Sequence, residues 1–181
     1  MLTKDQYRVI KKRTVNFLKT KGIALTKEEE NERIEIVDHG FGINQPVMAQ
    51  ILVYINTDKY CAKELVMFPF QIIPEHRHPP VNGYMGKQET FRCRFGKVYL
   101  YVPGKHTDNL KVQIPENRKR YFTVFHEMIL HPGEQYTLTP NTLHWFHSGS
   151  KGAIVSEFSS KSIDEYDIFT DPEIKRITEI I

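Results

Sequence analysis

The sequence is poor in cysteine and carries little net charge. Only Cys61 and Cys93 are cysteines, so the chain has no disulfide framework, and we expect both thiols to be reduced in a reducing compartment. The formal net charge of +3 is too small to indicate a nucleic-acid partner. These two scarcities argue against a disulfide-stapled secreted module and against a nucleic-acid-binding protein.

Long apolar segments are also missing. The longest apolar run, Ile51 to Ile55, is far too short to span a membrane, and MLTKDQYRVIKKR holds no apolar segment of signal-peptide length. We therefore expect a cytoplasmic protein with no membrane partner. Internal repeats and low-complexity linkers are absent too, so the 181 residues are predicted to form a single domain, 1–181.

Two segments near the N-terminus begin with a capping-box signal. Thr3 pairs with Gln6 in the first segment, and Thr26 pairs with Glu29 in the second. An amphipathic helix is predicted after the first signal. A short acidic helix is predicted after the second, running towards Ile34.

The chain from residue 49 onwards changes to short β-rich runs. The predicted strands are Ile51–Asn56, Cys61–Pro69, Gln71–His78, Glu89–Phe95, Lys97–Val102, Tyr121–Leu130, Gln135–Thr139, Leu143–His147 and Ala153–Phe158. They predict an all-β jelly-roll barrel over 49–160, with an interior that can hold a ligand. Residues 1–48 would form a helical cover outside it. A C-terminal tail, 161–181, would carry a short helix at Asp171-Pro172, because proline suits the first helical position.

Two histidines and a glutamate stand at a spacing that has a chemical use. His76 and His78 share one face of a predicted strand, because strand side chains alternate. Glu89 begins the next strand and shares its apolar face with Phe91 and Phe95. An unpaired carboxylate there is costly, and a metal ion held jointly with two neutral histidines would remove that cost.

A fourth ligand is expected from the segment HPGEQYTLTPNTLHWFHSG. It contains a turn at Pro132-Gly133, a predicted strand, a second turn at Pro140-Asn141 and then His144. The sequence thus predicts a metal site with His76, His78, Glu89 and His144 as ligands.

The order of these residues resembles the two motifs of the cupin superfamily. The motifs here read His76-x-His78, ten residues, Glu89, six residues, Gly96, and then Gly133, six residues, Pro140, three residues, His144. The spacer before the glutamate is longer than is usual for cupins, which predicts an enlarged loop carrying Tyr84 and Lys87. The resemblance covers roughly residues 65–160 and implies a cupin double-stranded β-helix.

Within the cupins the chain is most similar to the D-lyxose isomerases, which are small metal-dependent sugar isomerases. The segments that carry this similarity are Pro69–Pro79 (PFQIIPEHRHP), Gly86–Phe91 (GKQETF), Phe95–Tyr101 (FGKVYLY) and Val155–Ser159 (VSEFS). The resemblance implies Mn²⁺ as cofactor, a monosaccharide substrate and a homodimer. The ligand set alone would also accept Co²⁺, Fe²⁺, Ni²⁺ or Zn²⁺.

Glu157 and Lys87 are the candidate catalytic residues. Glu157 shares strand parity with Ala153 and Val155, which directs a carboxylate with no metal assigned to it towards the cavity, as a general base requires. Its alternative role is that of a salt-bridge partner for an interior lysine or arginine. Lys87 shares the parity of Glu89 and can donate to a sugar hydroxyl or stabilise a negative oxygen, although loop lysines are usually solvated.

Two further residues are candidate substrate contacts. Tyr84 would close its loop over the substrate. His126 shares the parity of Phe122, Val124 and Met128 and would face the cavity, although a satisfied core histidine is an equally good interpretation.

The resemblance implies interconversion of D-lyxose with D-xylulose, and of D-mannose with D-fructose, by enediol proton transfer. The metal would hold the oxygens on C1 and C2 while Glu157 moves a proton from C2 to C1. Three alternatives stay open: a cupin phosphosugar isomerase, which needs a cationic phosphate pocket; an Fe²⁺-dependent cupin dioxygenase, which consumes oxygen; and a non-enzymatic sugar-binding cupin.

Overall fold

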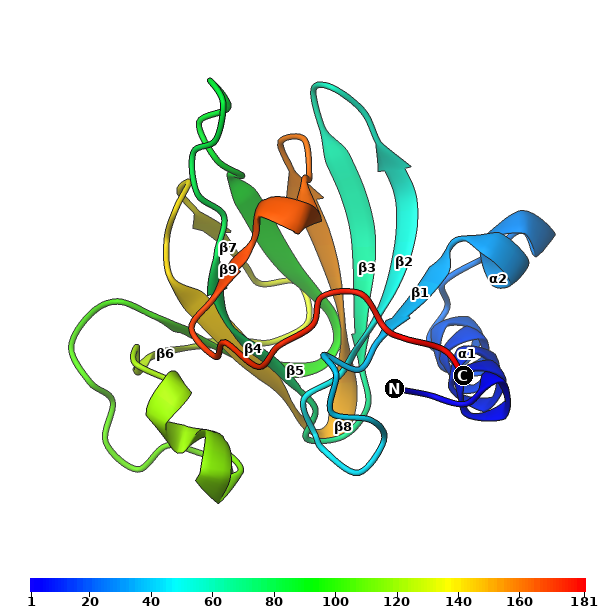
Figure 1. The fold of residues 1–181 in the computed structure, drawn as a ribbon, viewed down its shortest axis with the longest axis horizontal. Coiled ribbons are helices and arrows are strands. Elements are labelled where there is room, and N and C mark those ends of the chain that lie inside the picture. The colour runs from blue at the N-terminus through cyan, green and yellow to red at the C-terminus, as the bar shows by residue number, and fades with distance from the viewer.

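Strands dominate the protein and curl into one nine-stranded sheet (Figure 1). A computed structural model of the chain describes residues 1–181. The elements are α1 (Lys4–Thr20), α2 (Lys27–Glu32), β1 (Ile34–Val37), β2 (Ala49–Asn56), β3 (Cys61–Met67), β4 (Ile72–Arg77), β5 (Glu89–Val102), β6 (His126–Leu130), β7 (Gln135–Leu138), β8 (His144–Ser159) and β9 (Ile168–Phe169), with 3₁₀-helices at Glu116–Tyr121 and Asp164–Tyr166. The mostly β, cupin-like architecture with N-terminal helices confirms the predicted class.

β8 holds the sheet together because its two halves have different neighbours. Its first half lies between β4 and β5, and its second half lies between β3 and β5. The strand order β1-β2-β3-β8-β4-β9 therefore folds back on itself, and β5 carries β6 and β7 on its other side. This curling brings the ends of β4, β5 and β8 to one cavity.

The two N-terminal helices begin where their capping signals predict. Both capping boxes are formed: Thr3 Oγ1 accepts from the Gln6 amide at 3.1 Å, and Thr26 Oγ1 accepts from the Glu29 amide at 3.2 Å. α1 covers the outer face of the sheet, where Leu18 joins a buried apolar cluster (Figure 1). Neither helix has the length and apolar character needed to cross a membrane.

The second helix is shorter than predicted. It ends at Glu32, and Ile34–Val37 form β1, which pairs antiparallel with β2. Ile34 and Ile36 are buried on the outer face beneath α1, and Val37 is buried on the inner face. Burial of this apolar run within a sheet outweighs its helical propensity, so the predicted cover 1–48 also contains a strand.

β5 and β8 are each one continuous strand, although two strands were predicted for each. The pairing between them is irregular: Gly96 faces Ala153, whereas Val98 faces Ser148. The two backbones approach so closely at this point that a Cβ on Gly96 would lie 2.0 Å from the Gly152 oxygen. Gly96 also has a φ of +78°, so only glycine fits the crossing.

The same irregularity changes which side chains face the cavity. His144 and Phe146 face inward before the extra residues of β8, and Val155 and Glu157 face inward after them. In β5 the pairing skips a residue between Cys93 and Phe95. Phe95 therefore packs on Phe17 of α1 outside the sheet, and its predicted position on the Glu89 face is wrong.

The strand predicted from Tyr121 begins only at His126. Tyr121 ends a 3₁₀-helix, and the amides of Thr123 and Val124 donate to the buried carboxylate of Glu75 at 2.6 and 3.0 Å. Because a side chain satisfies these amides, the segment has no need of a strand partner.

Residues 161–181 cross the front of the sheet towards α1 in Figure 1, and we call them the C-terminal strap. The strap contains no α-helix, so the short helix predicted at Asp171-Pro172 is wrong. The buried Asp171 carboxylate instead accepts from Arg118 at 3.0 Å and from the Glu173 amide at 2.9 Å. β9 of the strap pairs with β4, the strand that carries His76.

Candidate metal centre

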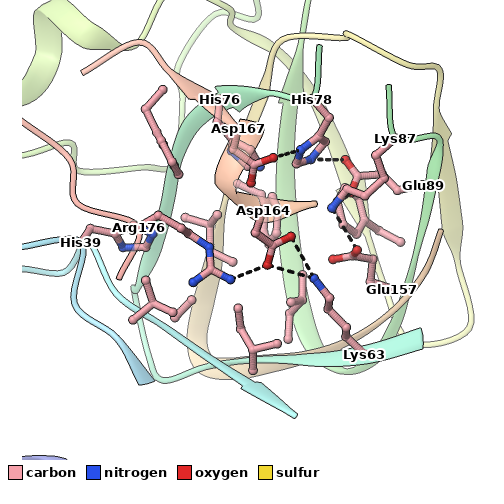
Figure 2. A pocket seen from close by; sticks show the side chains of 18 residues that line it. His39, Lys63, His76, His78, Lys87, Glu89, Glu157, Asp164, Asp167 and Arg176 are labelled. Atoms are coloured by element: carbon pink, nitrogen blue, oxygen red, sulfur yellow. Dashed lines mark hydrogen bonds and ion pairs between the residues drawn. The ribbon is translucent and has the colours of Figure 1, made fainter. Parts of the chain in front are cut away.

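The four predicted ligands meet inside the curled sheet. His76 lies near the end of β4, His78 directly follows that strand, Glu89 begins β5 and His144 begins β8. The ligand nitrogens of the three histidines lie within 4.8 Å of one another. Glu89 Oε1 lies 3.2 Å from His78 Nε2 (Figure 2). The same oxygen lies 3.1 Å from His144 Nε2.

The outer nitrogen of each ring is already occupied. Nδ1 of His76 faces the Pro74 carbonyl at 2.8 Å, and Nδ1 of His144 faces the Thr142 carbonyl at 2.9 Å. Nδ1 of His78 faces Asp167 Oδ1 at 2.5 Å. Because carbonyls and carboxylates only accept, each Nδ1 carries a proton, and each ring in its neutral form offers its Nε2 lone pair to the cluster.

The centre of the cluster lacks a positive partner. Nε2 of His78, Nε2 of His144 and Glu89 Oε1 are buried and form no hydrogen bond. Three lone-pair-bearing atoms that face one another without a donor are unfavourable unless a cation lies among them. Nitrogen and carboxylate donors of this kind suit a divalent transition metal, so the residues present fit a bound metal ion.

The electrostatics of the cluster favour a positive charge at the same point. Burial and the imidazoles of His144 and His78 hold the pKa of His76 well below its usual range. Burial acts to lower the pKa of His78, but Glu89 and Asp167 outweigh it and raise that pKa to about 9. A proton on His78 or a bound metal ion would supply this charge.

Lys87 and Glu157 lie beside the cluster, as predicted. Lys87 Nζ is 2.8 Å from Glu89 Oε2 and 3.0 Å from Glu157 Oε1. Burial acts to lower the pKa of Lys87, but the two carboxylates outweigh it and hold the pKa well above its usual range. Glu157 thus lines the cavity, as predicted, and is also the salt-bridge partner of an interior lysine.

A second group of charges lines the cavity away from the histidines (Figure 2). Asp164 lies between Lys63, at 3.2 Å, and Arg176, at 2.5 Å. Burial acts to raise the pKa of Asp164, but these cations outweigh it and hold the pKa well below its usual range. Sequence reasoning missed this group, although Lys63 shares strand parity with Cys61 and the buried Leu65.

The cavity between the two groups has a volume of about 60 Å³. Its apolar wall is formed by Val37, Ala49, Ile51, Leu65, Ile73, Phe91, Phe146 and Phe169. An apolar wall with a few convergent polar groups is typical of a small-molecule site.

Tyr84 and His126 lie outside the cavity lining. The Tyr84 hydroxyl lies 3.0 Å from Ser160 Oγ and donates to the Lys161 carbonyl at 2.5 Å, so it fixes its loop to the start of the strap. His126 Nδ1 donates to the Lys105 carbonyl at 3.0 Å, in a contact between β6 and a surface loop. Strand parity alone does not show where along a strand the cavity ends, so the roles of Tyr84 and His126 as substrate contacts stay predictions.

The fold and the site together define a cupin-like barrel with a buried histidine centre. Among solved structures, Cellulomonas parahominis L-ribose isomerase with L-ribose matches with a TM-score of 0.80 at 14% identity, covering 99% of this chain and 98% of that chain. The model of the D-lyxose isomerase family matches residues 51–181. The chain belongs to the D-lyxose isomerase family.

Two curated relatives extend the match to the whole chain. The D-lyxose ketol-isomerase of Thermofilum sp. (strain ex4484_79) is 61% identical over 181 residues, covering 100% of both chains. The D-lyxose/D-mannose isomerase of Thermosediminibacter oceani is 60% identical over 180 residues, covering 99% of both.

Proposed function

We propose that the protein is a divalent-metal-dependent aldose–ketose isomerase that interconverts D-lyxose with D-xylulose and D-mannose with D-fructose. The observation that carries the proposal is the placement of Glu157 and Lys87 beside the histidine and glutamate cluster. A general base next to a metal centre is what proton transfer between the two carbons of an α-hydroxy aldehyde requires. The names of the two relatives support the choice of sugars.

His76, His78, Glu89 and His144 would hold the metal ion. When bound, a divalent ion supplies Lewis-acid stabilisation of negative charge on substrate oxygens. The donor set accepts several divalent metals and does not select one of them. We therefore propose Mn²⁺ by resemblance to the family.

Glu157 would take the proton from C2 of the aldose and return it to C1, while the ammonium group of Lys87 would donate a proton to the oxygen on C1 and take one back from the oxygen on C2. Lys87 is buried beside Glu157 and positively charged, so it can donate to a substrate oxygen and stabilise negative charge on that oxygen. The buried position of both side chains excludes bulk water from the proton path.

Lys63, Asp164 and Arg176 would recognise the hydroxyl groups remote from the reacting carbons. Each offers charge-assisted hydrogen bonds, which suit hydroxyls. Lys63 and Arg176 are balanced by the carboxylates of Asp164 and Glu35, so this end of the cavity has no surplus cation for a phosphate and suits a neutral polar group. We accordingly favour free sugars as substrates. We also propose that the chain forms a homodimer, as the family resemblance implies.

The decisive experiment strips the protein with a chelator, adds back Mn²⁺ and follows formation of D-xylulose from D-lyxose, with D-mannose as the second substrate. We expect turnover only after metal is restored. Absence of turnover with one metal bound per chain would overturn the isomerase function and leave the metal centre standing. Oxygen uptake and turnover of phosphorylated sugars, measured on the same sample, test the dioxygenase and the phosphosugar isomerase.

A second measurement separates proton transfer from hydride shift. Isomerisation in D₂O should place deuterium at C1 of the product if Glu157 exchanges its proton with solvent. Deuterium at C1 would establish proton transfer, whereas a product without it fits either a hydride shift or a Glu157 proton that returns before it exchanges, and loss of turnover in Glu157→Gln separates these two cases.

A further inference from the structure

The three histidines of the centre are not oriented in the same way. His76 and His144 donate to carbonyls two residues earlier in the chain, at 2.8 and 2.9 Å. Their rings are therefore fixed as soon as the local backbone forms. His78 instead donates to Asp167, a side chain 89 residues away on the C-terminal strap, at 2.5 Å.

Asp167 is itself held firmly between neighbours in the structure. Its side chain is only 9% exposed. The residues that follow it pair with β4, where Ile168 faces Arg77 and Phe169 faces His76. The Phe169 ring stacks on the His76 ring with centroids 5.4 Å apart.

The strap is anchored again one residue further on. The Thr170 amide donates to the Glu75 carbonyl at 3.0 Å, and the Thr170 hydroxyl donates to Glu75 Oε1 at 2.7 Å. Glu75 precedes His76 on β4, so the strap binds to the strand that supplies His76 and leads directly to His78. The pairing of the strap with β4 therefore fixes the position of Asp167 next to His78.

We propose that Asp167 is the positioning residue for His78, and that metal binding and docking of the strap stabilise each other. A carboxylate that accepts from Nδ1 fixes the ring orientation and strengthens Nε2 as a metal ligand. By thermodynamic linkage, the free energy by which strap docking strengthens metal binding equals the free energy by which metal binding strengthens strap docking. The inference rests on the proposed metal centre.

The test compares Asp167→Asn with Asp164→Asn by calorimetric titration of the metal-free proteins with Mn²⁺. Both changes remove a carboxylate from the strap, but only Asp167 contacts a histidine of the centre. We expect Asp167→Asn to bind Mn²⁺ about 10- to 100-fold more weakly than wild type, and at least tenfold more weakly than Asp164→Asn. A smaller difference between the two variants overturns the positioning role.

If Asp167→Asn fails to fold, Asp167→Glu replaces it, since that variant keeps the charge and displaces the acceptor. A tenfold or greater loss relative to Asp164→Asn is again the supporting result. Failure of wild type to bind Mn²⁺ would instead remove the proposed centre itself, so the two failures are distinguishable.

Hydrogen exchange tests the reciprocal half of the proposal without any activity measurement. The Thr170 amide should exchange more slowly in wild type when Mn²⁺ is bound, because local opening of the strap must then work against metal binding. The slowing should be largely lost in Asp167→Asn at saturating Mn²⁺. An exchange rate at Thr170 that is the same with and without metal overturns the coupling.

Discussion

Lys87 Nζ lies 3.0 Å from Glu157 Oε1, and the two side chains are only 6% and 5% exposed. A buried ion pair of this kind is costly to desolvate and adds little net stability. Its position beside the histidine cluster is better explained by the proposed chemistry, in which Glu157 would accept a proton and Lys87 would stabilise negative charge.

Replacement of Glu157 by glutamine should separate metal binding from proton transfer. Glutamine keeps the size of the side chain and removes the base, and Glu157 is not a member of the histidine cluster. We expect kcat on D-lyxose to fall by about 10²- to 10⁴-fold while Mn²⁺ stoichiometry stays at the wild-type value. Near-wild-type turnover would show that another group moves the proton.

Replacement of Lys87 by methionine should lower turnover without weakening the metal site. Lys87 Nζ lies 2.8 Å from Glu89 Oε2, so it competes with a metal ion for this carboxylate. We expect kcat to fall by about 10²- to 10³-fold and Mn²⁺ affinity to stay the same or rise. Titration with Mn²⁺ beside steady-state kinetics checks both; a parallel loss of affinity and turnover would contradict the assignment.

Replacement of His76 by alanine should abolish metal binding and turnover together. The loss removes one of three clustered nitrogens, and we expect Mn²⁺ affinity to fall by about 100-fold or more. His126→Ala is the matched control, because His126 contacts a surface-loop carbonyl and lies outside the cavity lining. Equal losses in both variants would indicate general destabilisation instead.

His39 should make the folded state sensitive to acid. Burial lowers the pKa of His39 to about 4, so the unfolded chain, with a pKa of about 6.5, takes up a proton first as the pH falls. Stability is therefore lost as the pH falls below about 6.5, by about 2 kcal/mol between pH 7 and pH 5.

The variant His39→Asn should lack this part of the pH dependence. Asparagine tolerates the positive φ of 51° at this position, so the backbone need not change. Urea unfolding of both metal-free proteins at pH 7 and pH 5 gives the comparison. Identical losses in the two proteins would show that His39 does not titrate as described.

Gly96→Ala should be far more destabilising than Gly133→Ala. Both glycines have positive φ, but a Cβ at Gly133 meets nothing within 4 Å, whereas one at Gly96 meets the Gly152 oxygen at 2.0 Å. We expect a loss of about 1 kcal/mol at Gly133, from backbone strain alone, and of more than about 2 kcal/mol at Gly96. Thermal unfolding measures the difference, and equal losses would mean that the crossing of β5 and β8 relaxes freely.

The clustering of the four candidate ligands could be predicted because its signals are local. His76 and His78 share a face through strand alternation, and Glu89 and His144 each stand at the start of a strand after a marked turn. Glu157 could be placed for the same reason, since the alternation from Ala153 onwards is regular. The curled sheet also followed from many short β-rich runs.

The contribution of the strap could not be predicted, because it depends on contacts between residues far apart in the sequence. Nothing near Asp167 indicates a histidine partner, and Arg176 reads as one charge among several in a polar tail. β5 and β8 were each predicted as two strands for a related reason. Glycine usually marks a turn, whereas Gly96 and Gly152 mark a close crossing of two continuous strands.

The bend in β8 between Ser148 and Ala153 has a consequence for changes in chain length. Side chains of a strand alternate between its two faces, so the number of residues in this bend decides on which face Glu157 lies relative to His144. Ser150 and Lys151 are exposed and lie outside the cavity lining. Deleting either one would nevertheless turn the second half of β8 over, so that Glu157 would point away from the cavity although no residue of the site had been replaced.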